Sequence, residues 1–509
     1  MPCTTLLVGK NASFDGSTIV ARNEDSPGGK FTPKKFAVVL PADQPSHYRS
    51  VLSHVEVELP ENPMRYTSLP DAIPVEGIWG EAGVNTANVS MSETETLTTN
   101  ERVLGADPLV MLRPAKGNPG EPGYEPEVPG GIGEEDMLTL VLPYIRTARE
   151  GVLMLGELLE RYGTYEMNGI AFSDVNEIWW LETVGGHHWI ARRVPDDAYV
   201  TMPNQLGLDY FDLNDAFGEQ REYLCSPDLR EFMAENHLDL TMRISEGTLP
   251  EGVFNPREAF GSHSDSDHVY NTPRAWAMQR FLSPHAEDWD APGCPCGPES
   301  DQIPWCRVPE RKLTMEDVKY ALSLHYQGTP FDPYGRLGTE ATRGLYRPIG
   351  INRNGQLSAV QLRPGVPEAV CAVQWIAYGS NPFNALVPLY ANVDEAPEYF
   401  ANTDDRVSTE SFYWANRLVA GLADAHFGAC LPDIERYQLK VGGEGHRVIG
   451  ATDRRVREEG LGYAEAAPVL AEANASTAAF VREQTDDLLG KVLLTVSLAM
   501  KNGFSRSDG

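Results

Sequence analysis

The chain opens with two strand-like runs joined by a turn-rich segment, and this pair constrains the fold more than any other feature of the sequence. Residues 4–8 and 17–21 are rich in β-branched and apolar side chains, whereas residues 9–16 between them are mostly turn formers. The two runs predict an antiparallel hairpin with its loop centred near Ala12 or Ser13. The register of this hairpin decides which side chains meet at its open end.

A cysteine stands at that open end. The predicted register brings Arg22 or Asn23 opposite Cys3, so we expect Arg22 and Asp25 to lie beside the thiol. An arginine stabilises a thiolate, and an aspartate can anchor either the guanidinium or an α-ammonium group. A single cysteine near a terminus is also typical of an inert core residue, and Arg-x-x-Asp of a surface ion pair. The residues alone leave both interpretations open.

Trimming of the chain would give this cysteine a second role. A protein that began at Cys3 would carry a thiol nucleophile and a free α-amine on one carbon. With an ordinary pKa of about 7.7 to 8.0, the amine is neutral often enough near pH 7 to take the thiol's proton. Because Pro2 follows Met1, removal of the methionine alone is insufficient. Either Cys3 cleaves its own upstream bond or another peptidase removes the dipeptide.

The clearest compositional feature is acidity. With 73 Asp and Glu against 42 Lys and Arg, the formal net charge of the 509 residues is -31. This charge argues against nucleic acids and anionic membranes as partners. No apolar run approaches the about 20 residues of a membrane helix, and the first residues lack the features of a signal peptide. Because the 7 cysteines are too few for a disulfide scaffold, we expect a cytoplasmic protein with reduced thiols.

The order of predicted elements indicates an α+β fold. Strand-like segments come first, at 36–40, 55–59, 77–79 and 88–91, and read as a β-meander. Two helices are predicted next, at 134–149 and 151–162, and strands return at 169–172, 177–183, 188–193 and 198–202. Strands, then helices, then strands predict two antiparallel sheets with helices on their outer faces.

The composition divides the chain into a large first part and a helical last part. We expect a catalytic domain over 3–400, with a Pro/Gly-rich surface excursion at 108–133 and a Cys/Pro-rich loop at 288–309. Residues 401–509 are expected to form a mostly helical extension packed on the same domain, with the strongest helical patterns at 410–426 and 466–501.

Several motifs in a fixed order resemble the dipeptidase A family of cysteine-type N-terminal-nucleophile (Ntn) hydrolases. This family is similar to the secernins and more distantly to penicillin V acylases and bile salt hydrolases. The resemblance implies a four-layer αββα sandwich with additional C-terminal helices, and a homo-oligomer. The motifs are CTTLLVG at 3–9, DGST at 15–18, ARNEDS at 21–26, WGEAGVN at 79–85, MSETET at 91–96, PNQ at 203–205, NTPR at 271–274 and HYQGT at 325–329.

The resemblance also implies roles for three further residues. Asn204 looks like the family's oxyanion asparagine and Asn85 like a second one, because acyl transfer needs donors aimed at a developing oxyanion. Asparagine also favours turns for its own backbone reasons, and turn residue is the other interpretation of both. Arg274, at a predicted helix start, is implied to be an active-site arginine, with the substrate's terminal carboxylate as a sensible partner.

A zinc site is the main competing interpretation of the polar residues. Cys294, Cys296 and Cys306 lie in one loop, but Cys-x-Cys with one distant cysteine is a poor match to the paired ligands of structural zinc. We therefore predict no metal and no organic cofactor. The predicted function is a cysteine dipeptidase that forms a thioester on Cys3. The alternatives are an Ntn amidase or acylase acting on non-peptide amides, and a non-catalytic secernin-like binding protein.

Overall fold

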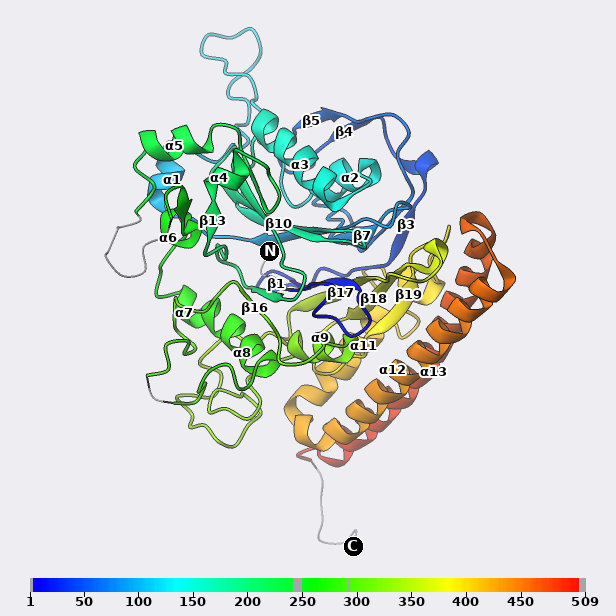
Figure 1. Cartoon of the computed structure of the whole chain (residues 1–509). Helices are drawn as coiled ribbons and strands as arrows, with labels where there is room; N and C mark the ends of the chain where they lie inside the picture. Colours follow the sequence, from blue (N-terminus) through cyan, green and yellow to red (C-terminus); the bar gives the residue numbers. More distant parts are fainter. Residues whose placement is uncertain (1–2, 241–249, 292, 503–509) are drawn as a thin grey trace, which may run out of the picture.

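Two antiparallel sheets dominate the computed structural model, which describes residues 3–240, 250–291 and 293–502 (Figure 1). In the first, here called the β1 sheet, the strand order is β16-β12-β1-β2-β17-β18-β19. Its strands are β1 (Cys3–Val8), β2 (Thr18–Asp25), β12 (Tyr199–Met202), β16 (Cys306–Arg307), β17 (Asn354–Leu362), β18 (Ala372–Tyr378) and β19 (Val387–Tyr390). The strand that begins with Cys3 is therefore central in its sheet.

The second sheet, here called the β9 sheet, has the order β14-β11-β10-β9-β8-β7. Its strands are β7 (Ala82–Val84), β8 (Ser90–Thr96), β9 (Asn168–Ser173), β10 (Ile178–Val184), β11 (His188–Arg193) and β14 (Tyr223–Cys225). Three short pairs complete the strands: β3 (Ala37–Val39) with β6 (Tyr66–Ser68), β4 (His47–Arg49) with β5 (Glu56–Glu58), and β13 (Phe211–Asp212) with β15 (Val253–Phe254). The predicted β-meander is wrong, because the early strands are distributed over separate sheets.

The opening hairpin forms, but its register differs from the prediction. Cys3 pairs with Glu24, rather than with Arg22 or Asn23, so the loop lies slightly further along the chain. Asp15 explains the shift, because its carboxylate accepts hydrogen bonds from the backbone N–H and the hydroxyl of Ser17, at 3.1 and 2.6 Å. Ser17 is thereby held in the turn, and β2 starts one residue later than expected.

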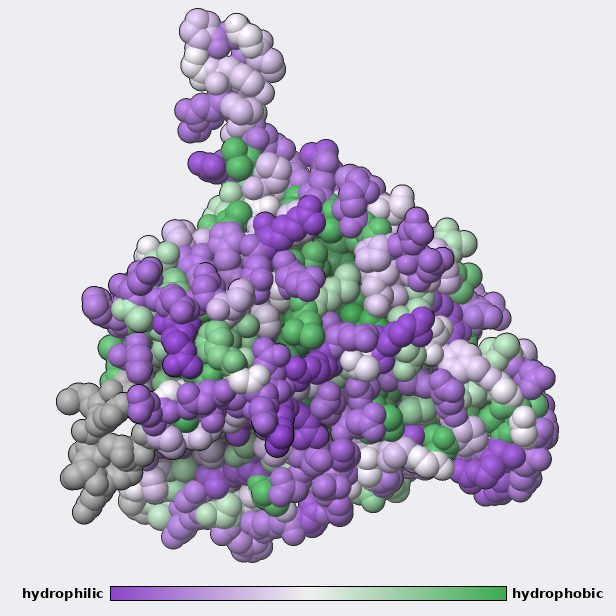
Figure 2. Space-filling view, turned by 45° about the horizontal axis from the view of Figure 1, so that its top comes forward, coloured by the Kyte–Doolittle hydropathy of each residue, from purple (hydrophilic) through white to green (hydrophobic). Residues whose placement is uncertain are grey.

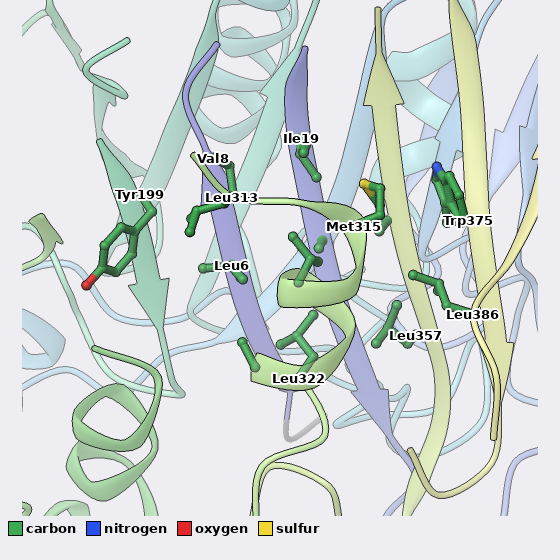
Figure 3. Packing of buried hydrophobic residues seen from close by; sticks show 14 of the residues in the cluster. Leu6, Val8, Ile19, Tyr199, Leu313, Met315, Leu322, Leu357, Trp375 and Leu386 are labelled. Carbon is green, nitrogen blue, oxygen red and sulfur yellow. The ribbon is translucent and has the colours of Figure 1, made fainter. Parts of the chain in front are cut away.

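The two sheets pack face to face through apolar side chains. Leu7 and Val20 of the β1 sheet belong to one buried cluster with Ala171 and Trp180 of the β9 sheet. Residues alternate along a strand, so Leu6 and its neighbours on the other side face the helices instead. Figure 3 shows Leu6 beside the helix that carries Met315 and Leu322, and Val8 close to Leu313 of the segment that leads into this helix. Cys3, in phase with Leu7, faces the space between the sheets.

Helices cover the outer faces (Figure 1). The first group, on the β9 sheet side and around the connections, is α1 (Glu101–Ala106), α2 (Met137–Val141), α3 (Ala148–Tyr162), α4 (Leu213–Ala216), α5 (Leu229–Glu235) and α6 (Pro256–Phe260). The second group, associated with the β1 sheet, is α7 (Asp267–Tyr270), α8 (Thr272–Leu282), α9 (Met315–Ala321), α10 (Glu398–Ala401), α11 (Phe412–Ala423), α12 (Phe427–Glu459) and α13 (Tyr463–Leu498). Short 3-10 turns occur at η1 (Pro41–Asp43), η2 (Leu142–Tyr144), η3 (Glu368–Val370) and η4 (Asp424–His426). The α+β class is as predicted.

The predicted helix over 134–149 is not continuous. The segment expected over 134–149 is broken into α2, η2 and the start of α3, because Pro143 has no N–H to continue the α-helical ladder.

At the C-terminal end, α12 and α13 form a long antiparallel pair beside β19 (Figure 1). In the part of the chain that is described, no helix is long and apolar enough to cross a membrane.

The excursion at 108–133 forms an arm that projects from the body (Figures 1 and 2). Two isolated bridges, Arg113 with Val128 and Lys116 with Glu125, hold its two sides together. The arm returns to the body through a bridge between Ile132 and Thr164. The chain therefore re-enters the interior directly before Glu134, which lies in the candidate site.

Candidate active site

Cys3 is the first residue of β1 and is fully buried, with 0% of its surface exposed. Nη2 of Arg22 lies 3.0 Å from its Sγ. Since Cys3 pairs with Glu24, Arg22 lies on the same face of the sheet, diagonally across the ladder. A guanidinium in this position favours the thiolate over the thiol. The predicted neighbour of the thiol is therefore in place despite the shifted register.

Two buried carboxylates hold Arg22. Its Nη1 lies 2.7 Å from Oε2 of Glu81, and its Nη2 lies 2.7 Å from Oε1 of Glu134. Glu81 adopts a φ of 66°, in the left-handed region that non-glycine residues rarely occupy. Such a conformation persists only where the surroundings hold it. Here the Glu81 carboxylate also binds a second buried cation.

That second cation is Lys34. Its Nζ lies 2.7 Å from Glu81, 2.5 Å from Asp71 and 3.9 Å from Glu24. Burial opposes the charged form of Lys34, but these carboxylates outweigh it and raise its pKa well above the usual value. Burial also raises the pKa of Glu24 to about 8 and that of Asp71 to about 6. Several acids thus compete for two buried cations on this side of the thiol.

On the other side of Cys3 its backbone nitrogen contacts a neutral amide. The backbone N–H of Cys3 donates to Oδ1 of Asn204 at 3.2 Å. Nδ2 of Asn204 donates to the carbonyl of Thr96 at 3.0 Å, and the backbone N–H of Asn204 donates to Asn271 at 3.1 Å. Asn204 follows the end of β12, as predicted, and it touches the atom that would become the α-amine.

Arg274 lies under the start of β1 and is 0% exposed. Its Nη1 donates to the carbonyl of Cys3 and, at 2.7 Å, to the hydroxyl of Thr4. Its Nη2 donates to the side-chain oxygens of Asn204 and Asn271, and its Nε donates to the carbonyl of Tyr270. These bonds use all five N–H donors of the guanidinium. The geometry therefore favours a role of Arg274 in holding the start of β1 over capture of a substrate carboxylate.

Asp25 was expected beside the thiol, and the structure gives it other partners. Residues three apart on a strand face opposite sides of the sheet, so Asp25 faces away from Arg22. Its carboxylate binds the guanidinium of Arg347 and accepts a hydrogen bond from Nδ2 of Asn354 at 2.5 Å. Asp25 therefore anchors a guanidinium, but it is that of Arg347 and not that of Arg22.

Asn85 is placed as a turn residue. Its Nδ2 donates to the carbonyls of Leu142 and Ile145, at 2.8 and 2.7 Å. Its Oδ1 accepts the backbone N–H groups of Ala87 and Val89. An asparagine amide has only two hydrogens, so none is left for an oxyanion. This corrects the expectation of a second oxyanion asparagine at Asn85.

Comparison with known proteins agrees with the motifs around this site. A model of peptidase family C69 matches residues 2–440. A dipeptidase of Bifidobacterium longum is 59% identical over 100% of both chains. The chain belongs to peptidase family C69. A probable dipeptidase A of Streptococcus pyogenes serotype M18 is 53% identical over 99% of this chain and 98% of the relative. Dipeptidase A of Lactobacillus helveticus is 42% identical over 96% of each chain.

The acidic residues of this C69 peptidase were not predicted as part of its site. Glu81 stands in the WGEAGVN motif at 79–85 and Glu134 follows the Pro/Gly-rich arm, so both resemble ordinary loop residues in the sequence. Lys34 lies in an irregular stretch before β3. A weak signal existed in three consecutive acids, Glu134 to Asp136, directly before an apolar run. The burial of these three acids becomes visible only in the structure, where the base of the arm packs against the sheets.

The cysteine loop gives no metal centre in the described part of this C69 peptidase. Cys294, Cys296 and Cys306 are free thiols. No group of three or more His, Cys, Asp or Glu residues within 3–240, 250–291 and 293–502 is arranged to hold a metal ion. Cys296 instead lies 3.4 Å from the guanidinium of Arg307, which also binds Glu287. Met1 and Pro2, whose removal was predicted, lie outside the described residues.

Proposed function

We propose that this protein is a cysteine dipeptidase of the Ntn class, with Cys3 as both nucleophile and, through its α-amine, general base. The observation that carries the proposal is the pair of contacts at Cys3. Its Sγ lies 3.0 Å from Arg22, and its backbone nitrogen lies 3.2 Å from Oδ1 of Asn204. The names of the relatives, dipeptidase and dipeptidase A, support the substrate class.

The chemistry begins with removal of Met1 and Pro2, which frees the amine of Cys3. The thiol proton passes to this amine while Sγ bonds to the carbonyl carbon of the substrate. An N–H of Asn204 stabilises the oxyanion that forms. Collapse breaks the C–N bond, and the α-ammonium returns its proton to the leaving amine. Water then attacks the thioester, releases the acid product and restores the thiol.

The architecture is consistent with this assignment. We interpret the two facing sheets and their outer helices as the four-layer αββα arrangement of Ntn hydrolases. Residues 3–400 would form the catalytic domain and 401–509 the helical extension. Arg274 positions the nucleophile, since it binds the carbonyl of Cys3 and the side chain of Asn204. Asp25 stays a proposed site residue, although its ion-pair partner is Arg347 and not Arg22.

Substitution of Cys3 tests the proposal. Cys3→Ala should lower kcat/KM for dipeptides by at least about 10⁴-fold, whereas Cys371→Ala, a matched buried thiol far along the chain, should leave it unchanged. The intact mass of the active wild-type protein should lack Met1 and Pro2. Dialysis against EDTA should leave activity unchanged, because no step uses a metal. Full activity of Cys3→Ala would disprove the mechanism.

A second measurement separates the dipeptidase from a binding protein. Iodoacetamide should modify Cys3 of the wild-type protein, and a dipeptide substrate should protect it in proportion to its occupancy of the site. A binding protein with an inert Cys3 would show neither modification nor hydrolysis. Retention of Met1 and Pro2 in a fully active preparation would contradict the α-amine as base while leaving the thiol as nucleophile.

A further inference from the structure

The carboxylates around Arg22 pose an electrostatic problem. Glu134 and Glu81 neutralise the guanidinium that favours the thiolate, and Glu166 adds a further carboxyl group nearby. Negative charge beside a thiol disfavours the thiolate. A nucleophile site gains nothing from this excess unless another cation joins it during the reaction. A dipeptide brings such a cation in its α-ammonium group.

Glu166 is the carboxylate best suited to receive it. Its Oε1 accepts the backbone N–H of Glu134 at 2.7 Å, which fixes the carboxylate beside the residue that binds Arg22. Burial and the neighbouring Glu134 raise the pKa of Glu166. Its surroundings therefore disfavour the carboxylate, and the positive charge of an ammonium group bound beside it would offset this effect.

An independent observation comes from Asn168 on β9. This side chain is 0% exposed, and among the described residues its Oδ1 has no hydrogen-bond partner. Its amide lies beside Glu166, because Nδ2 is 3.5 Å from the Glu166 carbonyl and a hydrogen bond from Asn168 lowers the pKa of the Glu166 carboxyl. A buried acceptor without a donor destabilises the folded protein. A ligand with N–H donors would satisfy it.

Two chains of contacts connect these groups to the nucleophile. One runs from Sγ of Cys3 through Arg22 and Glu134 to Glu166. The other runs from the nitrogen of Cys3 through Asn204 to the carbonyl of Thr96, which pairs with Asn168 in the ladder between β8 and β9. The α-ammonium of a dipeptide lies only two bonds from the scissile carbonyl carbon. It must therefore reside close to the thiol.

We propose that Glu166, Asn168 and Glu134 form the subsite for the α-ammonium of the substrate, so that the enzyme selects peptides with a free N-terminus. This inference rests on the proposed function and refines its substrate class. An ammonium has three N–H groups, and the subsite offers two carboxylates and one amide oxygen. It also distinguishes a dipeptidase from an amidase that accepts acyl groups lacking an amine.

The test compares alanyl-leucine with propanoyl-leucine, which differ only in the amine. The wild-type enzyme should cleave propanoyl-leucine with a kcat/KM at least about tenfold lower, since hydrogen bonds to charged groups contribute about 1.5 to 3 kcal/mol. Glu166→Gln keeps the oxygen that accepts from Glu134 but loses the charge. It should lower kcat/KM for alanyl-leucine about tenfold, leave propanoyl-leucine within about twofold, and so reduce the selectivity.

Matched variants complete the design. Glu157→Gln removes the same charge from the exposed side of α3 and should leave the selectivity unchanged. Asn168→Leu, which has nearly the same shape, should also reduce the selectivity. If Glu166→Gln keeps the wild-type selectivity, or if the wild type cleaves both compounds equally, the subsite is wrong while the dipeptidase survives. If the wild type cleaves neither, the proposed function itself fails.

Discussion

Two buried arginines flank Cys3, and they are held in opposite ways. Arg22 is bound by the carboxylates of Glu81 and Glu134, whereas Arg274 donates to two carbonyls, a hydroxyl and two amide oxygens. The charge of Arg22 is thus balanced locally, and the charge of Arg274 is solvated by neutral dipoles. The difference shows that one arginine sets the electrostatics of the thiol and the other sets the position of its backbone.

Removal of the first arginine should have the largest effect. Arg22→Met takes from the buried carboxylates of Glu81 and Glu134 the guanidinium that both bind, which should cost about 3 to 5 kcal/mol of unfolding free energy. It should also move the alkylation of Cys3 by iodoacetamide to higher pH. Urea denaturation and alkylation rates measure the two effects. Arg49→Met, at an exposed ion pair, should change stability by no more than about 0.5 kcal/mol.

Substitution of the second arginine should have a smaller and different effect. Arg274→Lys keeps the charge but cannot reproduce five donors in a fixed plane. We expect kcat to fall about 10- to 100-fold through misplacement of the nucleophile, with KM within about twofold. The pH at which Cys3 is alkylated should stay as in the wild type. A shift of that pH as large as in Arg22→Met would remove the distinction between the two arginines.

The smallest expected effect concerns Glu24 and the pH dependence of stability. Burial raises its pKa from 4.5 to about 8, so its contribution is fully present below pH 4.5 and is lost as pH rises through 8. Glu24→Gln should therefore match the wild-type Tm near pH 5 and exceed it by a few degrees near pH 9. A Tm difference that is constant across this range would show that Glu24 is ionised in the folded protein.

The sequence predicts the hairpin and the α+β class because both depend on local patterns. Residues 4–8 and 17–21 are two strand-like runs separated by a short segment of turn formers. This pattern is enough to predict that Arg22 lies near Cys3. The exact register required knowledge of the turn, where the Asp15 side chain holds Ser17. The early strands could not be assigned to sheets, because their partners are set by tertiary packing rather than by adjacency.

The acidic half of the site could not be predicted for a related reason. Glu134 is placed by the return of the arm through the bridge from Ile132 to Thr164, and Lys34 by its contacts with the distant Asp71 and Glu81. No local pattern encodes either arrangement. Asn85 and Asn204 look equivalent in the sequence, because Asn85 lies between two strand-like segments and Asn204 follows the end of one. Only their hydrogen bonds separate the turn residue from the residue that touches Cys3.

The central place of β1 has a consequence for the order in which the molecule is completed. This strand leaves the ribosome before every other strand described, yet its second neighbour, β12, follows about 200 residues later, as the pairing of Thr5 with Met202 shows. A lone hairpin is marginally stable in water, and long-range strand pairing is slow. Strand β1 therefore remains solvated, without its contacts to Asn204 and Arg274, until most of the chain has been made. With Cys3 as the proposed nucleophile, activity should appear late in folding, and the time at which it appears during refolding would report when the sheet closes around β1.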